Sequence, residues 1–425
     1  CIMNPFKHKP KMTGEKSLNN WTDLYPKPHN KNEVDPWTKC RVILMNGIEV
    51  EAAIFGHNFH RNCENQELRR KLAMARRVEQ QQQKRLNWLS PGDETQLETT
   101  IGYEHVAVDL TSWLAEHEPD PYVKDCLDFA LLEDFDHLYR YANLLEMDKN
   151  IPAHKLVQDY VEVTPGRPTI AHHRHPNEAV KKPCDFKTAD LRTKLHTLII
   201  TAGEHQTMNY YMNIGPTYEN DPGRKLYMEI GMVEEQHVTH YGSLLDPSCT
   251  WLENLLLREY TECYLNYSFY MTETDPYIKE IWEYHYEQEL DHLHDAVEML
   301  QEYEGKDYQE VMGGEGEFPE LLEFHDVKDY VRNVLENQVE LTADGESFKN
   351  VNDLPEDHEF FQYNTQVNGD AEEVPSHFVV GMMQDKNGED YRSEVEGENP
   401  REELRDRTED NTTLGRVPQH AGVNA

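Results

Sequence analysis

Acid–x–x–His pairs are the residues in this sequence whose types and spacing could bind a metal ion. In the apolar-periodic stretch 286–300, Glu289 and His292 lie three residues apart, so on a helix they point from the same face. With 80 acidic residues and 22 His in 425 positions, about 4 such pairs arise by chance. One pair alone is therefore weak support for a metal site, and its recurrence is what makes it informative.

The pattern recurs as three half-sites, each with two acids spaced 30 residues apart and a His three residues after the second acid. The first half-site is Glu104, Asp134 and His137; the second is Glu204, Glu234 and His237; the third is Glu259, Glu289 and His292.

An Asp-Pro step stands near the midpoint of each 30-residue interval, at Asp120-Pro121, Asp221-Pro222 and Asp275-Pro276. Asp as the N-cap and Pro at the first helical position are typical of a helix start. Residues equidistant from the turn of an antiparallel helix pair lie at the same height, here about 22 Å from the turn. The residues of each half-site are therefore predicted to converge deep between two helices. Buried acids and His there are explained either by a bound metal ion or by buried salt bridges. Few Lys or Arg share these faces, which favours a bound cation.

This arrangement resembles the ferritin-like superfamily of di-iron and di-manganese carboxylate proteins, such as rubrerythrins and manganese catalases, over residues 100–303. The resemblance implies that the nine half-site residues are metal ligands and that the cofactor is a dinuclear Fe or Mn centre. It also implies an oxidoreductase that acts on peroxide or dioxygen. No catalytic residue beyond the ligands is assigned.

The chain departs from that superfamily in having three half-sites rather than two, and Asp134 where Glu is usual, with Glu133 as a possible substitute. The short turn around Asp246-Pro247 makes the second and third helix pairs parallel, whereas the link 148–190 is long enough to let the first pair run opposite to both. Topology thus favours pairing the first half-site with the second or third. The purity of the motif favours pairing the second with the third, and the choice stays open.

A second hypothesis is a metal storage, carrier or shell-forming protein, and a third is a structural bundle without turnover. The polar arms 1–38 and 307–425 suit wrapping around neighbouring copies, so a homo-oligomer is expected. No C-x-x-C pair is present, which excludes a rubredoxin module and implies that any electron donor is a separate protein.

The expected fold is mainly α, a helical bundle of three antiparallel hairpins with a small N-terminal β-hairpin and long extended termini. The predicted domains are an arm with a β-hairpin at 1–63, a helix and linker at 64–99, the bundle at 100–303 and an acidic extended tail at 304–425. The β-hairpin is placed at 39–55, turning at Asn46-Gly47. The expected helices are 65–89, 101–116, 122–147, 191–214, 223–245, 251–272, 277–303 and 326–339.

Three further motifs have ordinary explanations that we prefer. His57, His60 and Cys63 are interpreted as part of a polar turn rather than a metal site. The run 172–175, which holds three His, is interpreted as part of a solvated crossover. The Tyr residues on the site helices are interpreted as core packing.

Composition limits the partners and the compartment. A net charge of −39 and a pI near 4.9 argue against nucleic acid and anionic membranes. No apolar run approaches the roughly 20 residues that span a bilayer. Seven scattered cysteines indicate reduced thiols and a cytoplasmic protein.

Overall fold

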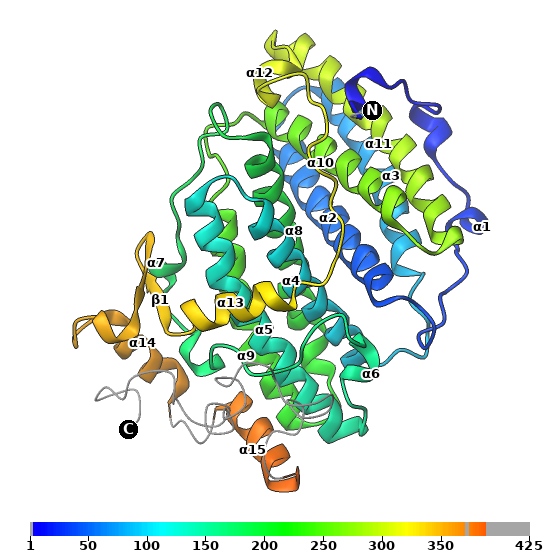
Figure 1. Ribbon diagram of the computed structural model, residues 1–425. Coiled ribbons are helices and arrows are strands. Elements are labelled where there is room, and N and C mark those ends of the chain that lie inside the picture. Colours follow the sequence, from blue (N-terminus) through cyan, green and yellow to red (C-terminus); the bar gives the residue numbers. More distant parts are fainter. Residues whose placement is uncertain (1–2, 370–373, 388–425) are drawn as a thin grey trace.

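The computed structural model describes residues 3–369 and 374–387, and within them the fold is mainly α, as predicted (Figure 1). Eight of its helices have 22 residues or more. They are α2 (Pro36–Arg61), α3 (Gln66–Asn87), α4 (Gln96–His117), α5 (Pro121–Lys149), α8 (Leu191–Ile214), α9 (Asp221–Gly242), α10 (Trp251–Thr272) and α11 (Pro276–Glu304).

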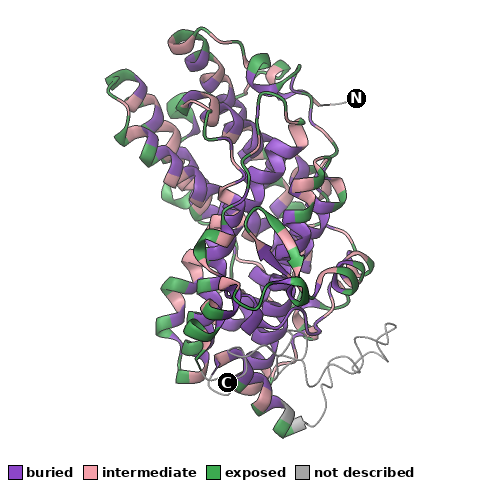
Figure 2. Ribbon diagram, turned by 90° about the vertical axis from the view of Figure 1, so that its left-hand side faces the viewer, coloured by how far each residue is buried: buried purple, intermediate pink, exposed green. Residues whose placement is uncertain are grey.

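Consecutive long helices form four hairpins, α2/α3, α4/α5, α8/α9 and α10/α11. The α4/α5 and α8/α9 hairpins pack together as one four-helix group, and the α2/α3 and α10/α11 hairpins pack as another (Figure 1). Helix α2 joins the groups because it also packs against α4 and α8. Buried residues follow the inward faces of these helices through both groups (Figure 2). The α2/α3 hairpin was not among the three that the sequence predicted.

Helix starts follow the expected capping chemistry with one shift. Asp120 and Asp275 cap α5 and α11 with their side chains, and each is followed by Pro at the first helical position. The cap of α9 is Asn220 rather than Asp221, so that prediction was wrong by one residue. Asp35 caps α2 in the same way as Asp120 and Asp275.

The predicted β-hairpin at 39–55 is wrong, because this segment lies inside the continuous helix α2. Asn46-Gly47 does not form a turn. Instead, the Asn46 side chain donates a hydrogen bond to Gln206 of α8. A Cβ on Gly47 would lie 3.0 Å from Gln206 Nε2 and 3.3 Å from the Ala202 carbonyl oxygen. Gly47 therefore allows α2 and α8 to approach closely. A turn was predicted at the Asn-Gly pair because local sequence carries no information on this contact.

The link between α5 and α8 contains only short elements, α6 (His154–Val157), η3 (Thr169–Ala171) and α7 (Pro176–Ala179). The prediction of a solvated crossover is wrong for its centre, since residues 163–174 are buried. A further short turn, η4 (Gly215–Thr217), precedes α9.

The chain after α11 is less extended than predicted. It forms α12 (Tyr308–Met312), α13 (Lys328–Gln338), a two-stranded antiparallel sheet of β1 (Leu341–Asp344) and β2 (Ser347–Asn350), η5 (Val351–Asp353), α14 (Glu359–Asn368) and α15 (Pro375–Asn387). The helix expected at 326–339 is confirmed by α13. Helix α15 packs on α5 and α9 and buries Val379 and Val380. The rest of the predicted tail, 388–425, lies outside the described residues.

The N-terminal arm contains η1 (Pro5–Lys7), η2 (Gly14–Ser17) and α1 (Trp21–Leu24), and it lies along α3 and α11 of its own chain. The Gly14 amide donates to Asp291 Oδ2 at 2.7 Å, and Gln288 Nε2 donates to the Ser17 carbonyl at 2.8 Å. The six described cysteines are free. None of the described helices combines the length and apolar character needed to cross a bilayer.

Candidate metal centre

The first four-helix group brings the first and second half-sites together. We call these residues the first cluster, and all are buried: Glu104 on α4, Asp134 and His137 on α5, Glu204 on α8, and Glu234 and His237 on α9. Their ligand atoms form two overlapping groups in which the atoms lie within 4.8 Å of one another, with Asp134 and Glu234 common to both. The pairing that the sequence left open is therefore first with second, as topology allowed.

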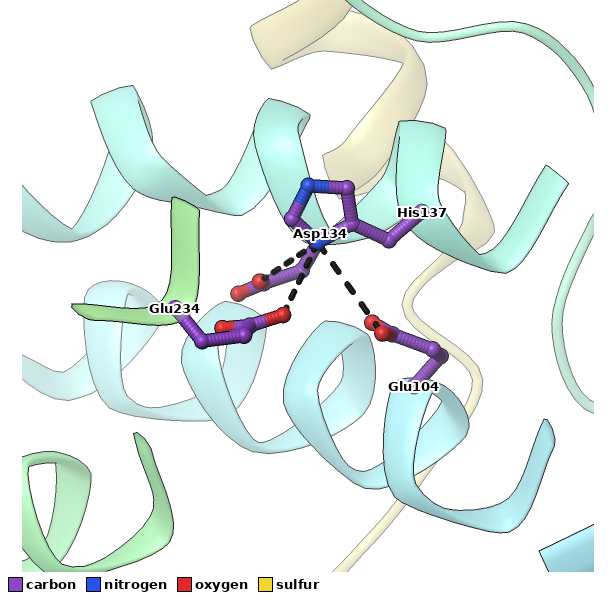
Figure 3. A group of neighbouring side chains, drawn as sticks. All are labelled: Glu104, Asp134, His137 and Glu234. Atoms are coloured by element: carbon purple, nitrogen blue, oxygen red, sulfur yellow. Dashed lines mark hydrogen bonds and ion pairs between the residues drawn. The ribbon is translucent and has the colours of Figure 1, made fainter. Parts of the chain in front are cut away.

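His137 marks one end of the first cluster (Figure 3). Its Nδ1 lies 3.0 Å from Glu234 Oε1, 3.7 Å from Asp134 Oδ1 and 3.9 Å from Glu104 Oε1. One imidazole thus faces three carboxylates that come from three different helices.

His237 marks the other end. Its Nδ1 lies 3.2 Å from both Asp134 Oδ1 and Glu234 Oε2, and 3.5 Å from Glu204 Oε2. Asp134 and Glu234 approach both imidazoles, whereas Glu104 and Glu204 each approach one. The cluster thus has two carboxylates shared between the imidazoles and two that face one imidazole each.

The polar atoms of the first cluster fit a cationic occupant. Both carboxylate oxygens of Asp134, both of Glu204 and Oε2 of Glu104 are buried without a hydrogen-bond partner. In the described part of the chain, the ion pairs of all four carboxylates run to His137 or His237 and never to Lys or Arg. Four buried carboxylates so placed are costly without added positive charge, which two divalent ions would supply.

Burial dominates the protonation of these groups. It raises the pKa of Glu104, Asp134 and Glu204, and neighbouring carboxylates add to the shift. Glu234 differs, because His137 and His237 outweigh the effect of burial and lower its pKa to about 2. Burial alone would lower the pKa of the His237 imidazole, but Asp134 and Glu204 raise it well above its usual value.

Glu133 does not substitute for Asp134 but lies behind the cluster. Its Oε1 is 3.6 Å from His237 Nε2, the nitrogen that points away from the carboxylates. Arg174 Nη1 donates to Glu133 Oε1 at 2.9 Å, and Arg167 and His172 each approach it to 3.7 Å. Although burial opposes ionisation, Arg174 and His172 hold the pKa of Glu133 well below its usual range. The Glu133 carboxylate thus lies on the outer side of the His237 imidazole, where carboxylates orient imidazole ligands in metal sites.

The buried crossover supplies the positive charge that faces Glu133. Within the run 172–175, His172, His173 and Arg174 are buried and only His175 is partly exposed, so most of the run is not solvated. His172 and Arg174 lie against Glu133 rather than forming a metal-gathering loop. Gly166 lets the crossover lie on α5, where its amide donates to Asp136 Oδ1 at 3.1 Å. Asp136 also pairs with Arg140 at 3.0 Å. The sequence reasoning missed this supporting layer, because its residues come from a segment without periodicity.

Tyrosines border the first cluster. Tyr211 donates a hydrogen bond of 2.5 Å to Glu104 Oε1. The hydroxyls of Tyr141 and Tyr241 are buried without a hydrogen-bond partner, and burial raises the pKa of both well above its usual value. At least Tyr211 therefore positions a cluster carboxylate in addition to filling the core.

A cavity of about 410 Å³ lies beside α9 and α14, and its lining includes Arg174, Gln236, Met228, Met232 and Tyr363. None of its lining residues belongs to the first cluster. Arg174 connects the two regions, because it reaches from the cavity wall to Glu133.

The third half-site lies in the other four-helix group and does not join the first two. His292 Nδ1 is 3.3 Å from Glu289 Oε2 and 3.7 Å from Glu259 Oε2. Three further carboxylates face these residues, and together we call the six the second cluster: Glu49 on α2, Glu79 on α3, Glu259 and Glu262 on α10, and Glu289 and His292 on α11.

Glu49 and Glu79 were missed by the sequence reasoning, although the signal was present. They are also 30 residues apart, but the residue three positions after Glu79 is Gln82 rather than His. The predicted β-hairpin further concealed Glu49. The pattern Glu49, Glu79 and Gln82 is thus a fourth copy of the half-site with an altered third residue.

The H-x-x-H-x-x-C motif has no metal-site geometry. His57 and His60 lie on the last turns of α2, and the His60 ring nitrogens face Arg69 at 3.2 Å and Arg76 at 3.3 Å. Two guanidinium groups next to this imidazole disfavour a cation there.

Comparison of the chain with protein-family models, with curated proteins and with solved structures found no match. The chemical interpretation of the site therefore depends on the geometry of its side chains.

Proposed function

We propose that the first cluster binds two Fe or Mn ions and that the protein is an oxidoreductase acting on peroxide or dioxygen. The observation that carries this proposal is the convergence of four buried carboxylates and two imidazoles, with no Lys or Arg among their ion-pair partners in residues 3–369 and 374–387. A Glu from each of two helices and an acid–x–x–His from each of two others is also the ligand arrangement of ferritin-like proteins.

The ligand types support the choice of metal. Two carboxylate-rich positions with one imidazole each favour Fe or Mn over softer metals. When bound, the metal pair would supply the electrons for reducing or disproportionating a small oxygen species. Asp134, Glu234, Glu104 and Glu204 would hold the ions together with His137 and His237.

The protein's own groups would hold this centre in position. Tyr211 holds Glu104 through its hydroxyl, and Glu133, 3.6 Å from His237 Nε2, would orient His237 in the metal-bound centre. The buried surroundings exclude bulk water. Disproportionation of peroxide needs no external donor, whereas reduction of dioxygen would require a separate electron-donor protein.

The alternative is metal storage or transport without turnover, in a homo-oligomer assembled through the arms. The described N-terminal arm lies on its own chain, so the interaction with neighbouring copies would depend on other surfaces. Metal content and turnover separate the two functions.

The test is elemental analysis of protein purified from its source, combined with assays of peroxide and dioxygen consumption. We expect Fe or Mn and turnover in the wild type. Glu234→Gln should lower turnover by at least about 100-fold, the scale of losing an essential group. Glu219→Gln, an exposed change on the loop before α9, should leave it unchanged. Bound metal without turnover would support storage, and absence of Fe and Mn would refute both functions.

A further inference from the structure

The second cluster has features of a metal site that are independent of the first. Its six residues come from all four helices of the second group and are buried. Both carboxylate oxygens of Glu49 lack a hydrogen-bond partner, as do Glu259 Oε2, Glu262 Oε2 and Glu289 Oε1. Gln82 Oε1 is buried beside them and is also without a partner. Such a concentration of unpartnered buried oxygens is costly unless a cation compensates it.

The charges of the second cluster need more compensation than those of the first. Five carboxylates face one imidazole, against four carboxylates and two imidazoles in the first cluster. Arg76 and Arg258 lie beside the cluster, in the lining of a small cavity that also includes Glu79, Glu259 and Glu262. Arg258 pairs with Glu51 at 3.5 Å, and Arg76 donates to the Gly56 carbonyl at 3.2 Å. These two partners lie outside the cluster, and the guanidinium groups act on Glu79 and Glu262 only through longer-range electrostatics.

The ligand atoms of the second cluster divide into two unlike groups. Glu79, Glu259 and His292 form one, with an imidazole nitrogen among its donors, and Glu49, Glu262 and Glu289 form the other, with oxygens alone. In the four-hairpin pattern Gln82 occupies the position where the other three hairpins have His. Its amide nitrogen donates to Gln288 Oε1 at 3.1 Å, which leaves its oxygen available.

We propose that the second cluster is an asymmetric dinuclear cation site, with one nitrogen-and-oxygen position built on His292 and one all-oxygen position built on Glu49. Imidazole-containing sites accept Mn, Fe and Zn, whereas all-oxygen carboxylate sites favour hard cations such as Mn²⁺ or Mg²⁺. The two positions therefore select different metals. This site uses no residue of the first cluster, so a test of this site can fail while the proposed function of the first cluster holds, and the reverse.

A small cavity adjoins this site. It has a volume of about 20 Å³, room for a single water molecule, and its lining includes Glu79, Glu259 and Glu262. Arg76 and Arg258 also line it.

Metal counting on the full-length chain tests the proposal. Chelator-treated protein is dialysed against Mn²⁺ alone, and bound Mn is measured by elemental analysis. The wild type should bind about four equivalents, two in each dinuclear site. A Glu234→Gln/His237→Gln variant should retain about two, as should Glu289→Gln/His292→Gln. Glu298→Gln, an exposed change on α11, should match the wild type.

The outcomes distinguish the two sites. If the Glu234→Gln/His237→Gln variant binds no Mn²⁺, or if Glu289→Gln/His292→Gln binds as much as the wild type, the second site does not exist. Circular dichroism checks that each variant folds. If a variant does not fold, anomalous scattering from Mn²⁺-soaked wild-type crystals decides, because absence of a peak among Glu49, Glu259 and His292 overturns the proposal.

Competition with Zn²⁺ tests the asymmetry. In the Glu234→Gln/His237→Gln background, Zn²⁺ should displace about one of the two Mn²⁺ ions, the one beside His292. Adding Gln82→His should make both displaceable, because the all-oxygen position then gains an imidazole. Displacement of both ions without Gln82→His would show that the positions are equivalent and would overturn this part of the proposal.

Discussion

Neighbouring acids on one helix can have opposite chemical roles, as Glu133 and Asp134 show. Asp134 points into the first cluster, where burial raises its pKa. Glu133 points toward the crossover, where Arg174 and His172 keep it ionised. A difference of one position on a helix rotates a side chain by about 100°. The residues that surround each carboxylate then decide its role. Asp134 is a candidate metal ligand, whereas Glu133 contacts a candidate ligand from outside the cluster.

Glu133→Gln should weaken metal binding without removing a ligand. The change keeps the shape of the side chain but removes the charge that orients His237 and pairs with Arg174. We expect metal affinity to fall by about 10–100-fold, measured by competition with a chelator. The free energy of unfolding should fall by about 3–5 kcal/mol, since buried guanidinium charge is left uncompensated. An affinity equal to that of the Glu219→Gln control would show that Glu133 does not act on His237.

Metal affinity of the first cluster should rise with pH. In the metal-free protein the raised pKa values of Glu104 and Glu204 mean that these acids keep their protons to a higher pH than exposed carboxyl groups do. The raised pKa of His237 acts in the same direction. Metal binding requires the deprotonated groups, so it releases protons. Affinity should therefore increase by up to about tenfold per pH unit for each proton displaced.

Chelator competition at about pH 6 and pH 8 measures this slope, and calorimetry in buffers of different ionisation enthalpy counts the protons. Glu234, whose pKa is about 2, adds nothing in this range. An affinity that stays constant or falls with pH would contradict the protonation states inferred for the metal-free cluster.

Among the elements, the crossover between α5 and α8 packs closely against the backbone of α5. Gly166 lies so close to α5 that a Cβ there would be 2.6 Å from the Leu132 carbonyl oxygen and 2.9 Å from the Asp136 amide nitrogen. The same crossover presents Arg167, His172 and Arg174 to Glu133. Its position on α5 thus controls the layer that supports His237.

Gly166→Ala should destabilise the protein by about 1–3 kcal/mol, because backbone atoms of α5 cannot move aside. Denaturant unfolding measures the loss. The matched control is Gly92→Ala, where a Cβ would meet nothing within 4 Å, and its effect should stay within about 0.5 kcal/mol. Equal effects of the two substitutions would show that the crossover does not depend on this close approach.

At the scale of the whole molecule, the fold places one acidic cluster inside each four-helix group. Together the clusters bury nine carboxylates with three imidazoles, in a chain whose net charge is already −39. Unless cations are bound, each four-helix group is destabilised by its buried charges or by the protonation needed to neutralise them. Metal binding and folding are therefore expected to be coupled throughout the molecule.

Removal of metal should lower the thermal stability of the protein. Bound ions stabilise the folded chain by about 2.7 kcal/mol per site when the free metal is 100 times its dissociation constant. Calorimetry should show that the unfolding temperature falls after chelator treatment and recovers with Mn²⁺ but not with Na⁺. The Glu234→Gln/His237→Gln variant should recover only part of the shift. No change on metal removal would contradict metal binding in either cluster.

The sequence by itself determined the long helices other than α2, two of the three predicted caps and the heights of the ligand candidates, because these depend on local periodicity and capping chemistry. The segment Leu191–Ile214 and the caps Asp120 and Asp275 needed no tertiary information. The 30-residue spacing of Glu204 and Glu234 was enough to place them at one level of a hairpin.

Only the tertiary structure decided which hairpins face each other, because facing depends on the packing of helix surfaces far apart in the chain. In the folded chain the first half-site faces the second, and the third half-site faces the α2/α3 hairpin. It also showed that Gly47 serves helix contact rather than a turn, and that Arg174 from an irregular link supports His237 through Glu133. These relations are set by nonlocal packing and burial, for which periodicity along the chain carries no signal.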